Sequence, residues 1–134
     1  MTERAFSPQE IFAALHRHGV DYVAIGGIAA NAHGSRRLTL DVDIVPAPEE
    51  SNYERLAAAL DELGARAGDL NVLNGTIGAP PYEDLRERAI EVEVRGTPIR
   101  VASLDDLIAM KRASARPQDL RDIAELTAFE ELPE

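Results

Sequence analysis

Two carboxylates and a glycine pair are the residues in this sequence whose types and spacing best fit chemistry. Gly26 and Gly27 are followed, after thirteen residues, by Asp41 and Asp43, which alternate with apolar residues. Side chains at positions i and i+2 of a strand point to the same face, so Asp41 and Asp43 are expected side by side. Adjacent carboxylates repel each other unless a cation lies between them, and oxygen ligands suit Mg²⁺ or Mn²⁺. Because glycine amides can also hold phosphate, the combination predicts phosphoryl or nucleotidyl transfer.

As metal ligands, Asp41 and Asp43 would hold two cations about 3.5–4 Å apart. One cation would activate an acceptor hydroxyl, and the other would neutralise a triphosphate and the leaving pyrophosphate. The alternative is an exposed strand face that carries two acids, which is disfavoured because Asp is depleted in strands. Gly26 and Gly27 also fit a tight strand-to-helix turn, and this role is compatible with an approach of the backbone to phosphate.

A first group of basic residues follows the glycine pair. The segment 35–39 carries Arg36, Arg37 and Thr39, which we assign to nucleotide binding. Arginine matches phosphate oxygens through paired hydrogen bonds. One of the two arginines is expected to lie on the surface, and the sequence does not decide which.

A second basic group surrounds Lys111, which is the only lysine beside thirteen arginines. We predict that Lys111 meets the triphosphate as a point charge and that Arg116 belongs to the same nucleotide-binding group. Asp119 would pair with Arg116 or Lys111 and hold the geometry. The alternative is a solvated helix end without a ligand.

The composition indicates one domain over residues 1–134, large enough to bury a core of its own. The chain has 45% hydrophobic and 28% charged residues, as in an ordinary soluble globule, and it has no cysteine for a disulfide or a thiolate metal site. No apolar run of membrane-spanning length and no signal-peptide pattern occur, so a cytoplasmic location is the simplest interpretation. The net charge of −10 argues against a general nucleic-acid coat but not against a local basic pocket.

Hydrophobic periodicity and turn residues predict the elements that position these groups. Helices are expected at 8–18, 28–33, 53–63, 82–88, from 104 through 111, and from 117 to about 129. Strands are expected at 20–25, 40–45, 70–73, 90–94 and 99–102, the last two joined by a turn at 96–98. This pattern predicts an α/β or α+β domain with a small mixed sheet flanked by helices.

The stretch from Ile25-Gly26-Gly27 to Asp41-Val42-Asp43-Ile44 resembles the nucleotidyltransferase superfamily that includes DNA polymerase beta. The string 27–43 and the tail 104–120 are similar to its small bacterial branch, the minimal nucleotidyltransferases and the AbiEii-like toxins of toxin–antitoxin pairs. The resemblance implies the nucleotidyltransferase fold and an Mg²⁺- or Mn²⁺-dependent transfer of a nucleoside monophosphate from an NTP to a hydroxyl. The implied acceptors are a tRNA 3′ end or a side chain of a partner protein, with an antitoxin as a further partner and no membrane. The acidic charge mildly favours a protein or small-molecule acceptor.

One position departs from the superfamily, which usually supplies a third carboxylate from a neighbouring strand. Asn71 stands where that catalytic acid is expected. Asp69 lies two residues earlier, and Glu91 and Glu93 are fallback candidates that also fit the wet face of a hairpin. Asn71 therefore favours a second hypothesis, a degenerate module that binds nucleotide or a partner without catalysis. A third and weaker hypothesis is a structural domain with no ligand.

Overall fold

A computed structural model describes residues 8–36, 41–64, 70–73 and 78–131. The strands are β1 (Tyr22–Ile25), β2 (Val42–Pro46), β3 (Leu70–Val72), β4 (Ile90–Val94) and β5 (Thr97–Val101). The helices are α1 (Pro8–Arg17), α2 (Gly26–Ala32), α3 (Glu50–Leu63), α4 (Tyr82–Arg88), α5 (Leu104–Ser114) and α6 (Pro117–Glu131). The predicted α/β class and the predicted order of elements are confirmed.

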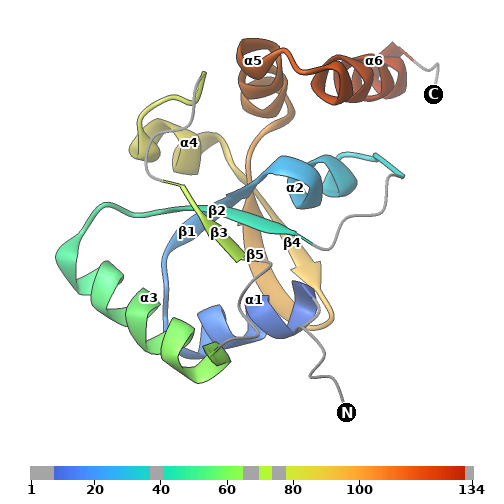
Figure 1. The fold of residues 1–134 in the computed structure, drawn as a ribbon. Coiled ribbons are helices and arrows are strands. Elements are labelled where there is room, and N and C mark those ends of the chain that lie inside the picture. Colours follow the sequence, from blue (N-terminus) through green and yellow to red (C-terminus); the bar gives the residue numbers. More distant parts are fainter. Residues whose placement is uncertain (1–7, 37–40, 65–69, 74–77, 132–134) are drawn as a thin grey trace.

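The strands form one mixed sheet in the order β3-β2-β1-β5-β4 (Figure 1). β1 pairs antiparallel with β2 and parallel with β5, while β2 pairs parallel with β3 and β4 pairs antiparallel with β5. α1 and α3 cover one side of the sheet, and α4 and α5 lie on the other side (Figure 1). The sheet is thus a layer between helices, as the sequence predicts.

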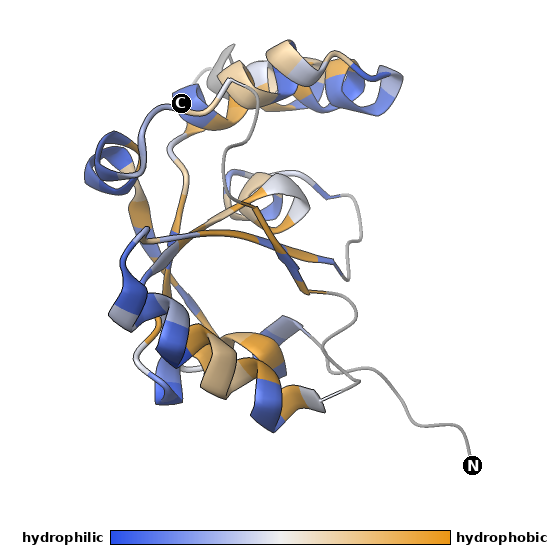
Figure 2. Cartoon of the chain, turned by 60° about the vertical axis from the view of Figure 1, so that its left-hand side comes forward, coloured by the Kyte–Doolittle hydropathy of each residue, from blue (hydrophilic) through white to orange (hydrophobic). Residues whose placement is uncertain are grey.

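β1 is the central strand, and all four of its residues are buried. Tyr22 and Ala24 belong to the core cluster that includes α1 and α3, whereas Val23 and Ile25 belong to the cluster that includes α4. Hydrophobic colouring runs along the strands in Figure 2, and the outer side of α3 is hydrophilic. A strand with helices on both faces needs apolar side chains on both faces, which explains the uninterrupted run in β1.

β2 alternates between the two faces of the sheet. Val42 and Ile44 are fully buried in the cluster with α1 and α3, as predicted. Asp43 lies between them and therefore projects to the opposite face, on the side of α4 and α5. The alternation of the sequence thus directs one carboxylate away from the main core.

Several element boundaries differ from the sequence prediction, and three of the differences lie near the polar residues or at the hairpin. α2 begins at Gly26 itself rather than at Ile28, and β2 begins at Val42, so Asp41 precedes the strand. The hairpin between β4 and β5 turns at Arg95 and Gly96, whose φ angles are 49° and 86°. Two consecutive positive φ values are typical of a type I′ turn, whose twist matches that of the strands, so the expected turn at 96–98 was placed too late.

His33 and Tyr53 are polar aromatic residues at two of the helices. His33 is the C-terminal cap residue of α2, and its Nε2 lies 2.8 Å from the carbonyl oxygen of Ala102. Tyr53 lies on α3 and is 39% exposed. Its neighbour Asn52 is buried instead.

No helix within the described ranges combines the length and apolar character required to cross a bilayer.

Asn52 links α3 to the beginning of β1 and the end of β2. Its side chain is fully buried, and its Oδ1 accepts from the amide of Asp21 at 2.8 Å. Its Nδ2 donates to the carbonyl oxygens of Asp21 at 2.8 Å and Ala47 at 3.1 Å. A buried amide whose donors and acceptor all have backbone partners fixes this corner of the sheet.

Replacement of Asn52 by alanine is expected to lower the free energy of unfolding by about 1–3 kcal/mol, because it removes the three hydrogen bonds that the Asn52 side chain makes to the backbone of Asp21 and Ala47. Urea denaturation of the purified protein measures this change. Glu54→Ala, at an exposed position of the same helix, is the matched control and should change stability by less than about 0.5 kcal/mol. Equal stability of the two variants would contradict the role given to Asn52.

Candidate active site

The strand register brings a polar pair to one row of the sheet. Asp43 of β2 lies opposite Ile25 of β1 on one side and opposite Asn71 of β3 on the other. Residues directly across from each other in a sheet share a face. The side chains of Asp43 and Asn71 do meet, since Nδ2 of Asn71 donates to Oδ1 of Asp43 at 2.9 Å. The structure therefore places Asn71 beside the carboxylate that the sequence assigned to catalysis.

Gly26 lies directly against Asp43. Its φ is +69°, and a Cβ at this position would be 2.2 Å from Oδ2 of Asp43 and 3.1 Å from its Cγ. Two constraints therefore exclude a side chain at residue 26: the backbone conformation and the neighbouring carboxylate. Gly27 follows as the second residue of α2.

The remaining residues predicted from the front motif fall into two groups. Asp41 immediately precedes β2 and is exposed, and Arg36 is exposed with its amide donating to Oε1 of Glu125 at 3.1 Å. Arg36 thus lies toward α6 and does not line the cavity described next. Arg37 and Thr39, like Asp69, lie outside the described residues.

A cavity of about 260 Å³ opens at the end of β1 beside Asp43. It is lined by residues from β1, α2, β2, α5 and α6, by the residue after β3 and by the link between α5 and α6: Ile25, Gly26, Asp43, Leu73, Leu107, Met110, Lys111, Ser114, Arg116 and Asp119. The cavity therefore gathers predicted site residues from both ends of the chain. It is the place where a carboxylate, a glycine backbone and two cationic side chains come together.

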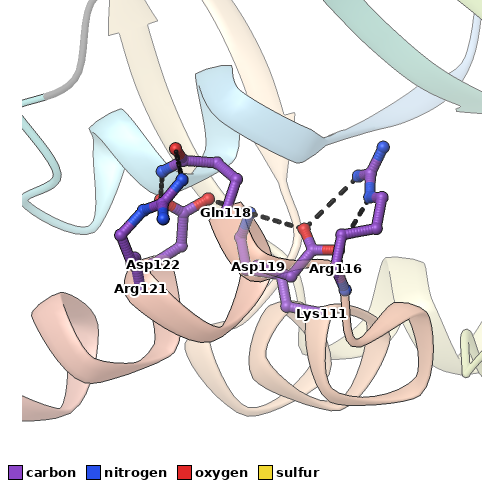
Figure 3. A network of polar contacts seen from close by, with 6 residues as sticks. All are labelled: Lys111, Arg116, Gln118, Asp119, Arg121 and Asp122. Carbon is purple, nitrogen blue, oxygen red and sulfur yellow. Dashed lines mark hydrogen bonds and ion pairs between the residues drawn. The ribbon is translucent and has the colours of Figure 1, made fainter.

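Lys111 is part of a buried network between α5 and α6 (Figure 3). It is 7% exposed, and its Nζ lies 2.8 Å from Oδ2 of Asp122 and 3.9 Å from Oδ1 of Asp119. Asp119 and Asp122 are themselves 3% and 2% exposed. Because a buried charge needs a partner, Lys111 holds the two helices together while it also lines the cavity.

Arg116 is the exposed cation of this site, with 75% of its side chain accessible. Its Nε donates to Oδ2 of Asp119 at 2.8 Å, and its Nη2 donates to Oδ1 at 3.3 Å (Figure 3). These bonds raise the pKa of the guanidinium, and the nearby Asp43 carboxylate acts in the same direction. The predicted pairing of Asp119 is therefore confirmed with Arg116, in a geometry that leaves much of the guanidinium open to an anion.

Asp122 and Gln118 are members of the network that the sequence analysis missed. Oδ1 of Asp122 accepts from Nε2 of Gln118 at 2.8 Å, and Oε1 of Gln118 accepts from Arg121 at 3.0 Å. The available signal was spacing, because Asp119 and Asp122 are three residues apart and share one face of a helix. Asp122 was missed because an acidic residue on a predicted helix is usually expected to be exposed to solvent, whereas Asp122 is buried.

The fallback acids Glu91 and Glu93 do not belong to this site. Both lie on β4, the edge strand opposite β3, with β1 and β5 between β4 and β2. Glu91 lines a different cavity, of about 300 Å³, near Tyr22 at the beginning of β1. Their fallback role as a replacement for the third carboxylate is therefore wrong, because the chain order of strands is not their order in the sheet. The alternative given for them fits, since both are exposed on the β4–β5 hairpin.

The residues present fit a divalent cation held jointly with a ligand. Within the described ranges, no three His, Cys, Asp or Glu side chains form a group that could bind a metal. Mg²⁺ is commonly bound through one or two carboxylates together with substrate phosphates, and it retains several waters. Asp43, with Asp41 two residues earlier, supplies such a minimal set, whereas a cage built from protein ligands alone is not found in these ranges.

Comparison with protein families decides the assignment. A family model described as "Nucleotidyltransferase of unknown function (DUF6036)" matches residues 9–132. The chain belongs to this nucleotidyltransferase family. The description does not mention a toxin, so the resemblance of this DUF6036 chain to AbiEii-like toxins stays a prediction. No curated protein matches the sequence.

Two solved structures share the fold of this DUF6036 member. An antigenic nucleotidyltransferase-like protein from Paracoccidioides brasiliensis is 19% identical, with a TM-score of 0.60, over 92% of this chain and 78% of that protein. ANT(2″)-Ia, in complex with adenylyl-2″-tobramycin, is 18% identical, with a TM-score of 0.62, over 90% of this chain and 86% of that protein. The predicted nucleotidyltransferase fold is thereby confirmed.

Replacement of Gly26 by alanine is expected to displace the Asp43 carboxylate and to reduce NTP binding at least tenfold, measured by calorimetry with a non-hydrolysable NTP. The matched control is Gly64→Ala, because Gly64 has a similar φ of +60° but nothing within 4 Å of the added Cβ. Both variants should lose about 1–2 kcal/mol of stability from the left-handed backbone. Unchanged NTP affinity in Gly26→Ala would contradict the steric coupling to Asp43.

Asp119 predicts a pH dependence of stability. Hydrogen bonds from the Arg116 guanidinium are the largest cause that lowers the pKa of Asp119 from 3.8 to about 2. A carboxyl whose pKa is lower in the folded state stabilises that state above pH 3.8, and the contribution is lost as the pH falls toward 2. Asp119→Asn should therefore be less stable than the unmodified protein at pH 6, and the difference should shrink below about pH 4.

Urea unfolding at several pH values measures this difference. Asp61→Asn, an exposed acid on α3, serves as the control and should show no comparable pH-dependent difference. A constant gap between Asp119→Asn and the unmodified protein from pH 6 to pH 3 would rule out the Arg116–Asp119 pair as its cause.

Proposed function

We propose that this protein transfers a nucleoside monophosphate from an NTP to an acceptor hydroxyl, with Mg²⁺ or Mn²⁺. The observation that supports the proposal is the cavity where Asp43, the backbone of Gly26 and the open face of Arg116 meet. A carboxylate that can share a cation with phosphates lies there opposite a guanidinium that can bind the same phosphates directly. Family membership supports nucleotidyl transfer as the general reaction.

The cationic side chains divide the work of binding the triphosphate. Arg116 is exposed and presents paired donors to phosphate oxygens. Lys111 forms ion pairs with Asp122 and Asp119 and contributes a positive charge to the wall of the cavity. Gly26 and Gly27 leave the backbone of the turn accessible to phosphate.

In the proposed reaction, the acceptor oxygen forms a bond to the α-phosphorus while the bond between that phosphorus and the bridging oxygen of pyrophosphate breaks. Pyrophosphate carries away the electron pair, and the hydroxyl proton goes to solvent. A divalent cation, when bound at Asp41 and Asp43, would neutralise charge on the triphosphate and on the leaving pyrophosphate. Arg116 would retain the pyrophosphate oxygens through the same step.

We propose a protein or small-molecule hydroxyl as the acceptor. The net charge of −10 opposes a tRNA substrate, because binding to a phosphate backbone needs a positive surface. ANT(2″)-Ia, whose fold is similar, is in complex with an adenylylated small molecule. A protein acceptor that is also a toxin–antitoxin partner is the alternative within this class.

Asp43→Ala is expected to reduce nucleotidyl transfer at least about 100-fold, since metal and carboxylate together supply several kcal/mol of charge stabilisation. The assay follows label from each α-labelled NTP, with Mg²⁺ or Mn²⁺, into RNA, protein or small molecules of a lysate of the source cells. Glu93→Ala is the matched control, an exposed acid on the opposite edge strand. Full activity of Asp43→Ala would overturn the assignment.

A degenerate binding module is the second candidate. The Asn71–Asp43 hydrogen bond favours it, because a neutral amide stands where the superfamily that the sequence resembles usually has a third carboxylate. Such a module would give no labelled product but a rise in Tm with NTP and Mg²⁺, since a ligand of the folded state stabilises it. A large gain of activity in Asn71→Asp would identify the native site as impaired. No change in Tm would favour a domain without a nucleotide ligand.

A further inference from the structure

The surroundings of Asp43 differ at its two oxygens. Oδ1 accepts a hydrogen bond of 2.9 Å from Nδ2 of Asn71, and Oδ2 lies in the space that a side chain of residue 26 would fill. The register Asp43↔Asn71 fixes the two side chains beside each other on one face of the sheet. One oxygen therefore faces an amide donor, and the other faces the glycine turn beside the cavity.

An amide donor is a poor neighbour for a metal ion. The hydrogens of an Asn Nδ2 carry positive partial charge and repel a cation, and the Asn side chain brings no negative charge of its own. A cation placed between Asp43 and residue 71 would have to break the hydrogen bond and would gain only a neutral ligand. The space on the Asn71 side of Asp43 is therefore unfavourable for a divalent ion.

The available ligands point the same way. Asp41 and Asp43 are the two carboxylates that the front motif offers as metal ligands. The described ranges contain no group of three acids or histidines, and Glu91 and Glu93 lie on the far edge strand. Because Mg²⁺ is commonly held by one or two carboxylates together with substrate phosphates, this donor set suits one cation shared with the phosphates.

We infer that this chain binds a single divalent cation together with its NTP, and that a second one is not bound because Asn71 presents a neutral amide donor to Asp43 where a carboxylate ligand would be needed. The inference rests on the proposed function, which requires an NTP and a metal. It assigns Asn71 as a positioning residue rather than a proton acceptor, because an amide has no basic site at neutral pH. Any proton released by the acceptor leaves without help from residue 71.

Metal stoichiometry tests the inference without any measurement of activity. Mn²⁺ is titrated into the full chain in the presence of a non-hydrolysable α,β-methylene NTP, and bound Mn²⁺ is counted by electron paramagnetic resonance. The unmodified protein should bind one Mn²⁺ per chain. Asn71→Asp should bind two, with the line broadening expected of ions about 3.5–4 Å apart.

Asn71→Ala is the matched control, since it removes the amide but adds no carboxylate, and it should stay at one Mn²⁺. Two Mn²⁺ in the unmodified protein would overturn the inference and leave the proposed function standing. Absence of any NTP-dependent Mn²⁺ would overturn the proposed function itself. One Mn²⁺ in a folded Asn71→Asp variant, checked by circular dichroism, would overturn the role given to Asn71.

Discussion

The close approach of the Asp43 carboxylate to the backbone of Gly26 is the constraint on which the rest of the site depends. β1 and β2 must pair in the register that sets Asp43 opposite Ile25, and the chain must then leave β1 through a positive φ to enter α2. Any side chain at residue 26 would push either the strand or the carboxylate out of place. The same contact therefore determines the wall of the cavity, the position of Asp43 and the entry of the chain into α2.

The opposite wall depends on charges that the fold itself uses. One buried lysine lies between two buried acids, so Lys111, Asp119 and Asp122 carry one excess negative charge, which Arg116 compensates from the surface. Removal of one member of such a group typically costs about 3–5 kcal/mol because its partners are left buried and unpaired. The ion pairs of Asp119 and Asp122 thus hold α6 against α5, and the Asp119 pair also positions Arg116 at the cavity. A loss of activity on removal of Lys111 would therefore combine both effects.

Local sequence signals predicted the elements well where the elements are defined locally. α4 was expected at 82–88 and is found there, because Pro81 stops the preceding chain and acids occupy the first turn. A helix was expected to begin at residue 104, and Oγ of Ser103, the residue before it, accepts from the amide of Asp106 at 3.2 Å. The alternation around Asp43 also predicted which neighbours are buried. These features arise within a few residues, where propensity and pattern act directly.

Long-range arrangement was less accessible to the sequence. Nothing in the pattern of β4 indicates that it lies three strands away from β2, so Glu91 and Glu93 were plausible neighbours of Asp43 until the sheet order was known. Asp122 was overlooked because burial of a helical acid becomes favourable only once Lys111 lies opposite. The position of Asn71 was predicted from the resemblance, but its donation to Asp43 required the register of β3.

The amide at position 71 gives the site a different balance between stability and charge. Three carboxylates gathered at one edge of a sheet repel one another until cations bind, so such a site is strained when empty. With Asn71, this repulsion is replaced by a hydrogen bond to a charged oxygen, which is stronger than a bond between neutral groups. Asp43 is then held in place before any ligand arrives, at the cost of the negative charge that would attract a second cation.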